Sequence, residues 1–225
     1  MTFDGATRRV RQTGGQPMSL CLEDGLSNSM ILLHVAMSLD GFIAGPGHDM
    51  SWTGGAEYDT PSELADEVAR ATGVVLAGRG WYEVASEDEG GAVAGIYGGA
   101  WSGPVLVLTH HPERLASDPT VDAVSNLESG LARAEELADG RAVSIFGANV
   151  ARQVLALGRL DEIIVQIVPL VLGDGVRLFG EAPAPRVRLE RTYVGTSGRL
   201  TDMRFRVAGP PTSEFGLDAI DENRL

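Results

Sequence analysis

The stretch Ile31–Gly47 reads ILLHVAMSLDGFIAGPG, and Val74–Glu83 reads VVLAGRGWYE. Each run is apolar and partly β-branched, and each stops abruptly at glycine and one charged side chain, Asp40 in the first and Arg79 in the second. This pattern is typical of a buried parallel strand. In open α/β sheets, ligands bind beyond the carboxyl ends of such strands. The two runs therefore predict a ligand site with an acid and an arginine, which suits a nucleotide-dependent enzyme.

Strand-like and helix-like segments alternate along the rest of the chain. Strands are expected at Met30–Met37, Val74–Ala77, Val105–Leu108, Val121–Val124, Ala142–Phe146 and Leu160–Leu172. Helices are expected at Ser62–Ala71, from Gly80 onward, at Leu127–Ala138 and at Asn149–Leu157. Val187–Val194 and Leu200–Val207 flank a glycine-containing turn and predict an antiparallel hairpin. The fold class is therefore α/β, with a mostly parallel, helix-covered sheet and antiparallel strands at its C-terminal end.

One domain is expected, from residue 30 to residue 208. Residues 1–29 are polar and without periodicity, which predicts a disordered extension, and residues 209–225 predict a flexible tail. The glycine-rich segment Glu87–Gly103 predicts either a binding loop or a plain linker.

Composition excludes several classes of protein. The formal net charge of −13 argues against a nucleic-acid partner. All 18 basic residues are arginine, which excludes a P-loop lysine and a Schiff-base lysine. Cys21 is the single cysteine, the four histidines form no zinc pattern, and no metal is expected. No apolar run is long enough to span a bilayer, so no membrane partner is expected and the cytoplasm is the expected location.

Two further strand ends carry ligand-type chemistry. Thr109 and His110 follow Val105–Leu108, and Gly147 opens the helix after Ala142–Phe146. A guanidinium such as that of Arg79 suits a monoester phosphate like the 2′-phosphate of NADP; the alternative role is a surface ion pair. The first amides after Gly147 suit a pyrophosphate, and the alternative is an ordinary strand–helix turn.

The motif GRGWYE places Glu83 where GxGxxG has its third glycine, which disfavours a Rossmann site. For proton chemistry, Glu57 and Asp40 are the acids best placed by the strand ends. His34, inside the first strand, is expected to be a packed residue.

Five motifs in order resemble the dihydrofolate reductase-like superfamily, and most closely the reductase domain at the C-terminus of bifunctional riboflavin-biosynthesis enzymes (the RibD C-terminal family) and its stand-alone bacterial relatives. The motifs are MSLDGFIAG (37–45), VVLAGRGWYE (74–83), VLVLTHHP (105–112), SIFGANVARQ (144–153) and DEIIVQIVPLVLGDGVRLFG (161–180). The resemblance covers about residues 30–208 and implies a three-layer fold with helices on both faces of the sheet.

The resemblance also implies an NADPH site. Phosphate contacts are implied for Arg79 with Gly78 and Gly80, and for Thr109 and His110. The pyrophosphate and nicotinamide would lie near Gly147, Ala148 and Asn149. The nicotinamide would be lined by Ala36, Leu39, Asp40 and Ile43. In folate reductases, a catalytic carboxylate lies five residues after a tryptophan. The same count from Trp52 gives Glu57. The resemblance therefore implies Glu57 as a catalytic acid, together with Asp40.

Three functions remain open. The first is a cytoplasmic NADPH-dependent reductase that acts on a small heterocyclic or carbonyl substrate. The second is a non-catalytic binding or regulatory protein, suggested by the bulky Phe42, Trp81 and Phe146. The third is the 5-amino-6-(5-phosphoribosylamino)uracil reductase of riboflavin biosynthesis, where relatives usually carry lysine in place of Phe42. A homodimer paired through Ile163–Leu172 and the hairpin is also expected.

Overall fold

The computed structural model describes residues 29–54, 62–87, 92–115, 117–180 and 186–212. Residues 1–28 of the predicted disordered extension and most of the predicted tail lie outside these ranges, and so does Glu57. None of the described helices is long and apolar enough to cross a lipid bilayer.

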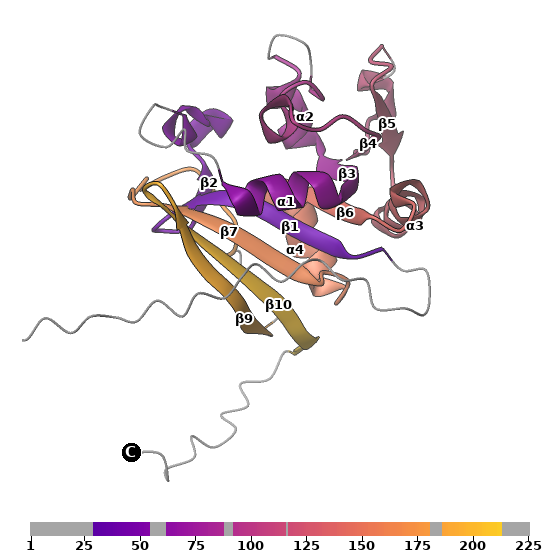
Figure 1. The fold of residues 1–225 in the computed structure, drawn as a ribbon. Coiled ribbons are helices and arrows are strands. Elements are labelled where there is room, and N and C mark those ends of the chain that lie inside the picture. The colour runs from indigo at the N-terminus through magenta and orange to yellow at the C-terminus, as the bar shows by residue number, and fades with distance from the viewer. Residues whose placement is uncertain (1–28, 55–61, 88–91, 116, 181–185, 213–225) are drawn as a thin grey trace, which may run out of the picture.

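An eight-stranded sheet forms the centre of the molecule, in the order β5-β4-β3-β6-β1-β7-β10-β9 (Figure 1). Its strands are β1 (Ile31–Ser38), β3 (Thr72–Gly78), β4 (Val105–Leu108), β5 (Val121–Val124), β6 (Ala142–Phe146), β7 (Glu162–Val168), β9 (Arg186–Ser197) and β10 (Leu200–Thr212). The strands from β5 to β7 run parallel, and β10 and β9 pair antiparallel at the end. The predicted fold class is confirmed, including the C-terminal hairpin.

Helices cover both faces of the sheet. On one face, α3 (Leu127–Ala138) and α4 (Ala148–Ala156) pack against alternate strand residues such as Leu33, Leu76 and Ile145. The opposite face is covered by α1 (Glu63–Ala71), α2 (Arg79–Ala85) and the segment around the 3₁₀ turn Ile96–Gly99. In Figure 1, α1 crosses in front of the sheet and α4 lies behind it. Because strand residues alternate between faces, each parallel strand supplies apolar side chains to both cores, which explains its continuous hydrophobic run.

A small second sheet was not predicted. It pairs β2 (Phe42–Ala44) with β8 (Val176–Arg177), next to the C-terminal end of β1. Both strands are too short to show a periodic pattern in the sequence.

The strand predicted at Leu160–Leu172 is shorter in the structure. β7 ends at Val168, and Pro169 follows, which has no amide hydrogen for a sheet hydrogen bond. Beyond it, the amides of Leu172 and Gly173 donate to the carboxylate of Asp40 over 3.0 and 2.8 Å. Tertiary contacts with the β1–β2 turn therefore replace sheet pairing here. Near the C-terminal end of the described chain, β10 extends to Thr212, beyond residue 208, which was the expected end of the domain.

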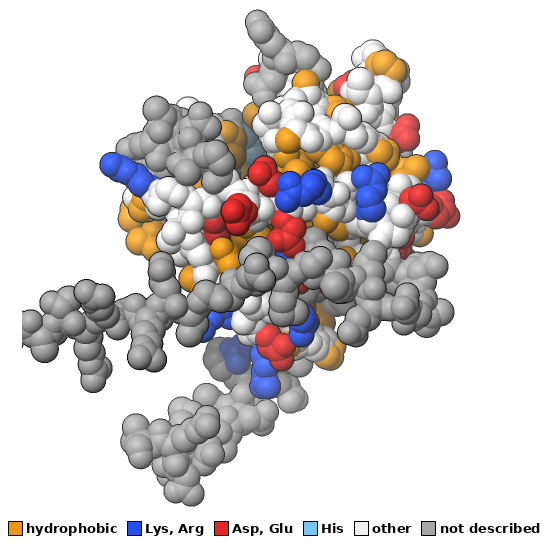
Figure 2. Space-filling model, viewed as in Figure 1, with side chains coloured by type: hydrophobic (Ala, Val, Ile, Leu, Met, Phe, Trp, Pro, Cys, Tyr) orange, Lys and Arg blue, Asp and Glu red, His pale blue; other side chains and the backbone are white. Residues whose placement is uncertain are grey.

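The segment Ile163–Leu172 offers no free strand edge to a second subunit, because β7 lies inside the sheet between β1 and β10. The exposed edge strand at this end is β9, which carries Arg186, Arg188 and Glu190. Charged edge strands disfavour strand pairing between molecules. On the face shown in Figure 2, arginine and acidic side chains are intermixed over the molecule. A homodimer that pairs through the hairpin stays a prediction.

Candidate functional site

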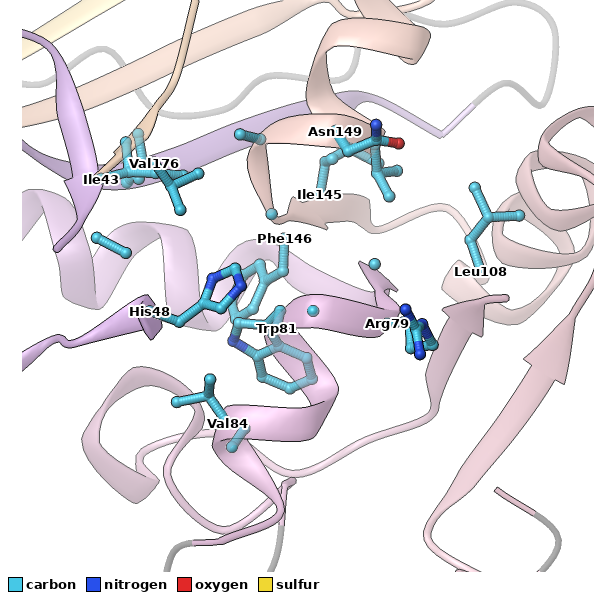
Figure 3. Close-up of a pocket in the computed structure, with 18 of the residues that line it drawn as sticks. Ile43, His48, Arg79, Trp81, Val84, Leu108, Ile145, Phe146, Asn149 and Val176 are labelled. Carbon is cyan, nitrogen blue, oxygen red and sulfur yellow. The ribbon is translucent and has the colours of Figure 1, made fainter. Parts of the chain in front are cut away.

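A cavity of about 1440 Å³ lies at the C-terminal edge of the parallel strands. Three neighbouring strands, β4, β3 and β6, end there, and the turns that follow them form part of its wall. The middle of β1, residues 33–36, also lines it. Only β3 and β4 are consecutive strands in the sequence, so the sheet order brings the other contributions together. Figure 3 shows His48, Trp81 and Phe146 close together in this cavity, with Arg79 toward the β4 side and Asn149 on α4.

Arg79 is the first residue of α2 and stands at the end of β3. Its side chain is 42% exposed, and its Nη1 lies 2.9 Å from Oε1 of Glu83, one helical turn later. An exposed pair of this kind contributes little to stability. The guanidinium is therefore available to an anion that competes with Glu83.

Thr109 and His110 follow β4 on the same side of the cavity. Thr109 is buried, and its Oγ1 accepts a hydrogen bond from the amide of His111 over 3.0 Å. This bond holds the turn so that both imidazoles, which are exposed, stand at the cavity wall. Neutral or charged, these rings offer N–H donors at neutral pH.

Gly147 joins β6 to α4 with φ of +92°, a conformation that favours glycine. This turn aims the N-terminal end of α4 at the cavity, which Gly147, Ala148 and Asn149 line. The first amides of a helix have no acceptor within the helix and carry the positive end of its dipole. The turn therefore forms a favourable place for a phosphate group.

A row of aromatic rings runs beneath the cavity. Trp81 meets Phe146 edge to face at 5.2 Å between ring centroids, and Phe146 meets Tyr97 at 5.7 Å. Tyr97 in turn stacks on His34 at 5.8 Å with an interplanar angle of 21°. The hydroxyl of Tyr97 donates to Ser144 Oγ over 3.1 Å. His34, Trp81 and Phe146 are among the residues that line the cavity, and the rings of Trp81 and Phe146 offer flat apolar surface to a ligand (Figure 3).

Burial keeps His34 neutral. Its pKa falls from 6.5 to about 4, chiefly because desolvation disfavours the charged ring, while the nearby Asp202 carboxylate acts in the opposite direction. The prediction that His34 is a packed residue describes its stacking on Tyr97, but the residue also lines the cavity.

Most of the predicted cofactor residues come together in this cavity. Its lining includes Ala36, Ile43, Gly78, Arg79, Gly80, Thr109, His110, Gly147, Ala148 and Asn149. Leu39 and Asp40 are not in the lining, and the Leu39 side chain is 69% exposed.

The structure argues against Asp40 as a proton donor. Its carboxylate accepts hydrogen bonds from Ser38 Oγ at 2.7 Å and from the amides of Leu172 and Gly173. These bonds favour the ionised form and lower its pKa from 3.8 to about 2, with the Ser38 bond contributing most. Asp40 instead connects the β1–β2 turn to the chain after β7. Glu57, the other predicted acid, stays a prediction.

Sequence reasoning missed several residues of the cavity. His48 and Asp49 lie in the turns after β2, where no periodicity or motif marks them. Trp81 and Phe146 belong to the motifs quoted above. Phe146 is the last residue of β6, and Trp81 follows shortly after β3. This position at a strand end was the signal that could have identified them as cavity residues. Within the described ranges, no group of three or more histidine, cysteine or acidic side chains is arranged to hold a metal ion.

Comparison with known protein families places this site in context. The model of the RibD C-terminal domain matches residues 29–201. The chain belongs to the RibD C-terminal domain family. A search of curated proteins found no match.

Solved structures share the fold of this family member. A Shewanella sp. PV-4 protein assigned to riboflavin biosynthesis has a TM-score of 0.61 at 22% identity, over 80% of this chain and 99% of its own. The riboflavin biosynthesis reductase of Saccharomyces cerevisiae has a TM-score of 0.52 at 16% identity, over 83% and 93% of the two chains. The bifunctional deaminase/reductase of Thermotoga maritima has a TM-score of 0.57 at 17% identity, over 81% of this chain and 57% of its own. At these identities the three structures show that the fold is shared.

Proposed function

We propose that this protein is an NADPH-dependent reductase that transfers hydride to a small heterocyclic or carbonyl substrate. The observation that carries the proposal is the meeting of Arg79, the Thr109–His110 turn and the Gly147 turn in one cavity. Bound NADPH would supply the hydride, and the protein would supply position and electrostatics.

The chemistry of the cavity wall fits a phosphorylated dinucleotide. Arg79 and the imidazole of His110 stand where the strands β3 and β4 end, and a guanidinium and N–H donors suit a 2′-phosphate. The N-terminal amides of α4, beside Gly147, suit the pyrophosphate. The apolar rings of Trp81 and Phe146 line the inner part of the cavity, where a flat nicotinamide and substrate would stack.

Glu57 remains our proposed proton relay, since the carboxylate of Asp40 accepts hydrogen bonds from Ser38, Leu172 and Gly173. A Glu57→Gln variant is expected to lose turnover of a reducible substrate while NADPH binds as in the wild type. Loss of cofactor affinity in this variant would instead give Glu57 a structural role.

A non-catalytic binding protein is the second candidate, favoured by the bulky rings of Trp81 and Phe146 in the cavity. Phe42, the third of the bulky residues, does not support this candidate through the cavity. It is buried, it does not line the cavity, and the guanidinium of Arg177 lies 4.2 Å from its ring centroid. NADPH binding without NADPH oxidation across a broad panel of heterocycles and carbonyl compounds would favour this candidate.

The uracil reductase step of riboflavin biosynthesis is a narrower form of the first proposal. Phe42 weakens this narrower proposal. Relatives usually carry lysine at this position, and the ring of Phe42 offers no cation to a ribose phosphate. Supplying the deaminated ribosylaminopyrimidine phosphate with NADPH tests this step directly. Failure to oxidise NADPH with that compound would discard it and leave the broader reductase standing.

Calorimetric titration with NADPH and NADH tests the cofactor proposal. The wild type is expected to prefer NADPH, and Arg79→Ala to lose roughly tenfold or more in NADPH affinity with little change for NADH, since bonds to charged groups contribute about 1.5–3 kcal/mol. Arg133→Ala is the matched control, because Arg133 pairs with Glu136 on the surface of α3 and does not line the cavity. No binding of NADPH at millimolar concentration would overturn the proposal.

A further inference from the structure

The glycine-rich segment of residues 92–103 lies behind the cavity and not in its wall. None of these residues lines the cavity. Ile96 and Trp101 are buried and pack against side chains of β3 and β4. The indole Nε1 of Trp101 also donates a hydrogen bond to the backbone carbonyl of Thr72 over 2.9 Å. The segment is therefore a packed layer of the core on this face of the sheet.

Tyr97, between these two anchors, has an unusual backbone conformation. Its φ of 50° and ψ of 41° lie in the left-handed region, and Gly98 and Gly99 follow with φ of 65° and 81°. Such a conformation is costly for an aromatic residue, whereas glycine adopts it readily. A tyrosine held in this conformation indicates that its side chain has a role that glycine could not fill.

A chain of hydrogen bonds fixes the hydroxyl group of Tyr97. This hydroxyl donates to Ser144 Oγ on β6 over 3.1 Å. Ser144 Oγ lies 2.8 Å from Thr72 Oγ1, and Thr72 Oγ1 donates to the carbonyl of Val68 on α1 over 2.8 Å. Because Thr72 uses its hydrogen there, Ser144 is the donor between the two hydroxyls. Ser144 and Thr72 are fully buried, so the tip of the Tyr97 side chain is tied to rigid positions of the core.

The ring of Tyr97 contacts two cavity-lining residues from behind. It meets Phe146 edge to face at 5.7 Å between ring centroids, and it stacks on His34 at 5.8 Å. Phe146 meets Trp81 edge to face at 5.2 Å, and Figure 3 shows these two rings together in the cavity. The Phe146 ring thus stands between Trp81 and Tyr97, although Tyr97 itself does not line the cavity.

We propose that Tyr97 is a positioning residue of the site and acts through Phe146. An aromatic side chain at a strand end can change its rotamer unless its neighbours restrict it. Contacts with Trp81 and Tyr97 restrict the Phe146 ring and hold its surface ready for the flat nicotinamide. The phosphate end of the cofactor, at Arg79, does not depend on this ring. The role of Tyr97 rests on the proposed reductase function.

Calorimetric titration of the full chain with two probes tests this role. NADPH carries the nicotinamide, and adenosine 2′,5′-bisphosphate carries the 2′-phosphate end without it. Wild type is expected to prefer NADPH, measured as the ratio of the two Kd values. In Tyr97→Leu this ratio is expected to fall roughly three- to tenfold, with little change in the Kd of the bisphosphate. Tyr97→Phe keeps both ring contacts and is expected to retain most of the preference.

Tyr82→Leu is the matched control. Tyr82 packs against the same hydrophobic cluster as Tyr97, its hydroxyl donates to Asp118 over 3.0 Å, and it does not line the cavity. Both tyrosine-to-leucine changes are expected to lower the Tm, but only the change at Tyr97 is expected to lower the ratio. If Tyr97→Leu does not fold, Tyr97→Met takes its place, because methionine fills irregular space in a core.

A double-variant cycle tests whether Tyr97 acts through Phe146. In the Phe146→Leu background, Tyr97→Leu is expected to cause no further fall in the ratio, because the ring that it positions is gone. A ratio that is unchanged in Tyr97→Leu, that falls equally in Tyr82→Leu, or that falls further in the Phe146→Leu background overturns the proposal.

The two proposals fail in distinguishable ways. If neither probe binds to the wild type, the reductase function falls, and the role of Tyr97 falls with it. If both probes bind, Arg79→Ala weakens both, and the ratio is insensitive to Tyr97→Leu, the role of Tyr97 falls alone.

Discussion

The carboxylate of Asp40 joins two segments that are far apart in the sequence. It accepts hydrogen bonds from Ser38 within its own turn and from Leu172 and Gly173 after β7. The amide of Leu39 adds a bond to the carbonyl of Leu170 over 2.8 Å. A residue that looks catalytic by its position at a strand end therefore has a structural role, because backbone amides occupy its acceptor sites.

Asp40→Asn is expected to lower the thermal stability of the protein at neutral pH. Because the folded-state pKa of Asp40 is about 2, below the ordinary 3.8, the stability it contributes is present above pH 3.8 and is lost as the pH falls toward 2. The difference in melting temperature between wild type and Asp40→Asn should therefore shrink over that interval. Thermal unfolding followed by circular dichroism measures it, and a difference that grows on acidification would contradict the assigned hydrogen bonds.

At the scale of elements, a buried ion pair fastens β10 to its neighbours. The side chain of Arg204 is 5% exposed, and its guanidinium lies 3.1 Å from Glu67 on α1 and 3.6 Å from Glu162 on β7. Burial raises the pKa of Glu162, and the charge of Arg204 counteracts this shift. The arginine thus holds a helix and a central strand against the hairpin that closes the sheet.

Arg204→Met is expected to lower the free energy of unfolding by roughly 3–5 kcal/mol, because it leaves carboxylates in a buried place without their cation. Arg206→Met is the matched control on the same strand. The Arg206 side chain is 56% exposed and lies 3.7 Å from Glu190, so its loss should cost less than about 1 kcal/mol. Urea unfolding of the two variants measures both values, and equal losses would show that burial of the pair does not matter.

At the scale of the whole molecule, the candidate site exists only in the folded sheet, because β1, β3, β4 and β6 all contribute to it. A ligand that bridges these strand ends opposes unfolding of the entire domain. NADPH at a hundred times its Kd is expected to add about 2.7 kcal/mol of stability and to raise the Tm by roughly 5–10 °C. Differential scanning calorimetry measures the shift. The shift should be much smaller for Arg79→Ala at the same NADPH concentration, and an equal shift would place the cofactor elsewhere.

The sequence alone determined the parallel sheet, its covering helices and the hairpin, because buried strands, amphipathic helices and tight turns leave local patterns. It also identified the strand ends at Arg79, Thr109 and Gly147, which line the cavity. Only the tertiary structure decided the features that leave no local sequence pattern. It placed β7 inside the sheet and gave Asp40 backbone partners 132 and 133 residues away. The physical reason is that the order of strands and the partners of a buried polar group depend on contacts between segments that are remote in the chain.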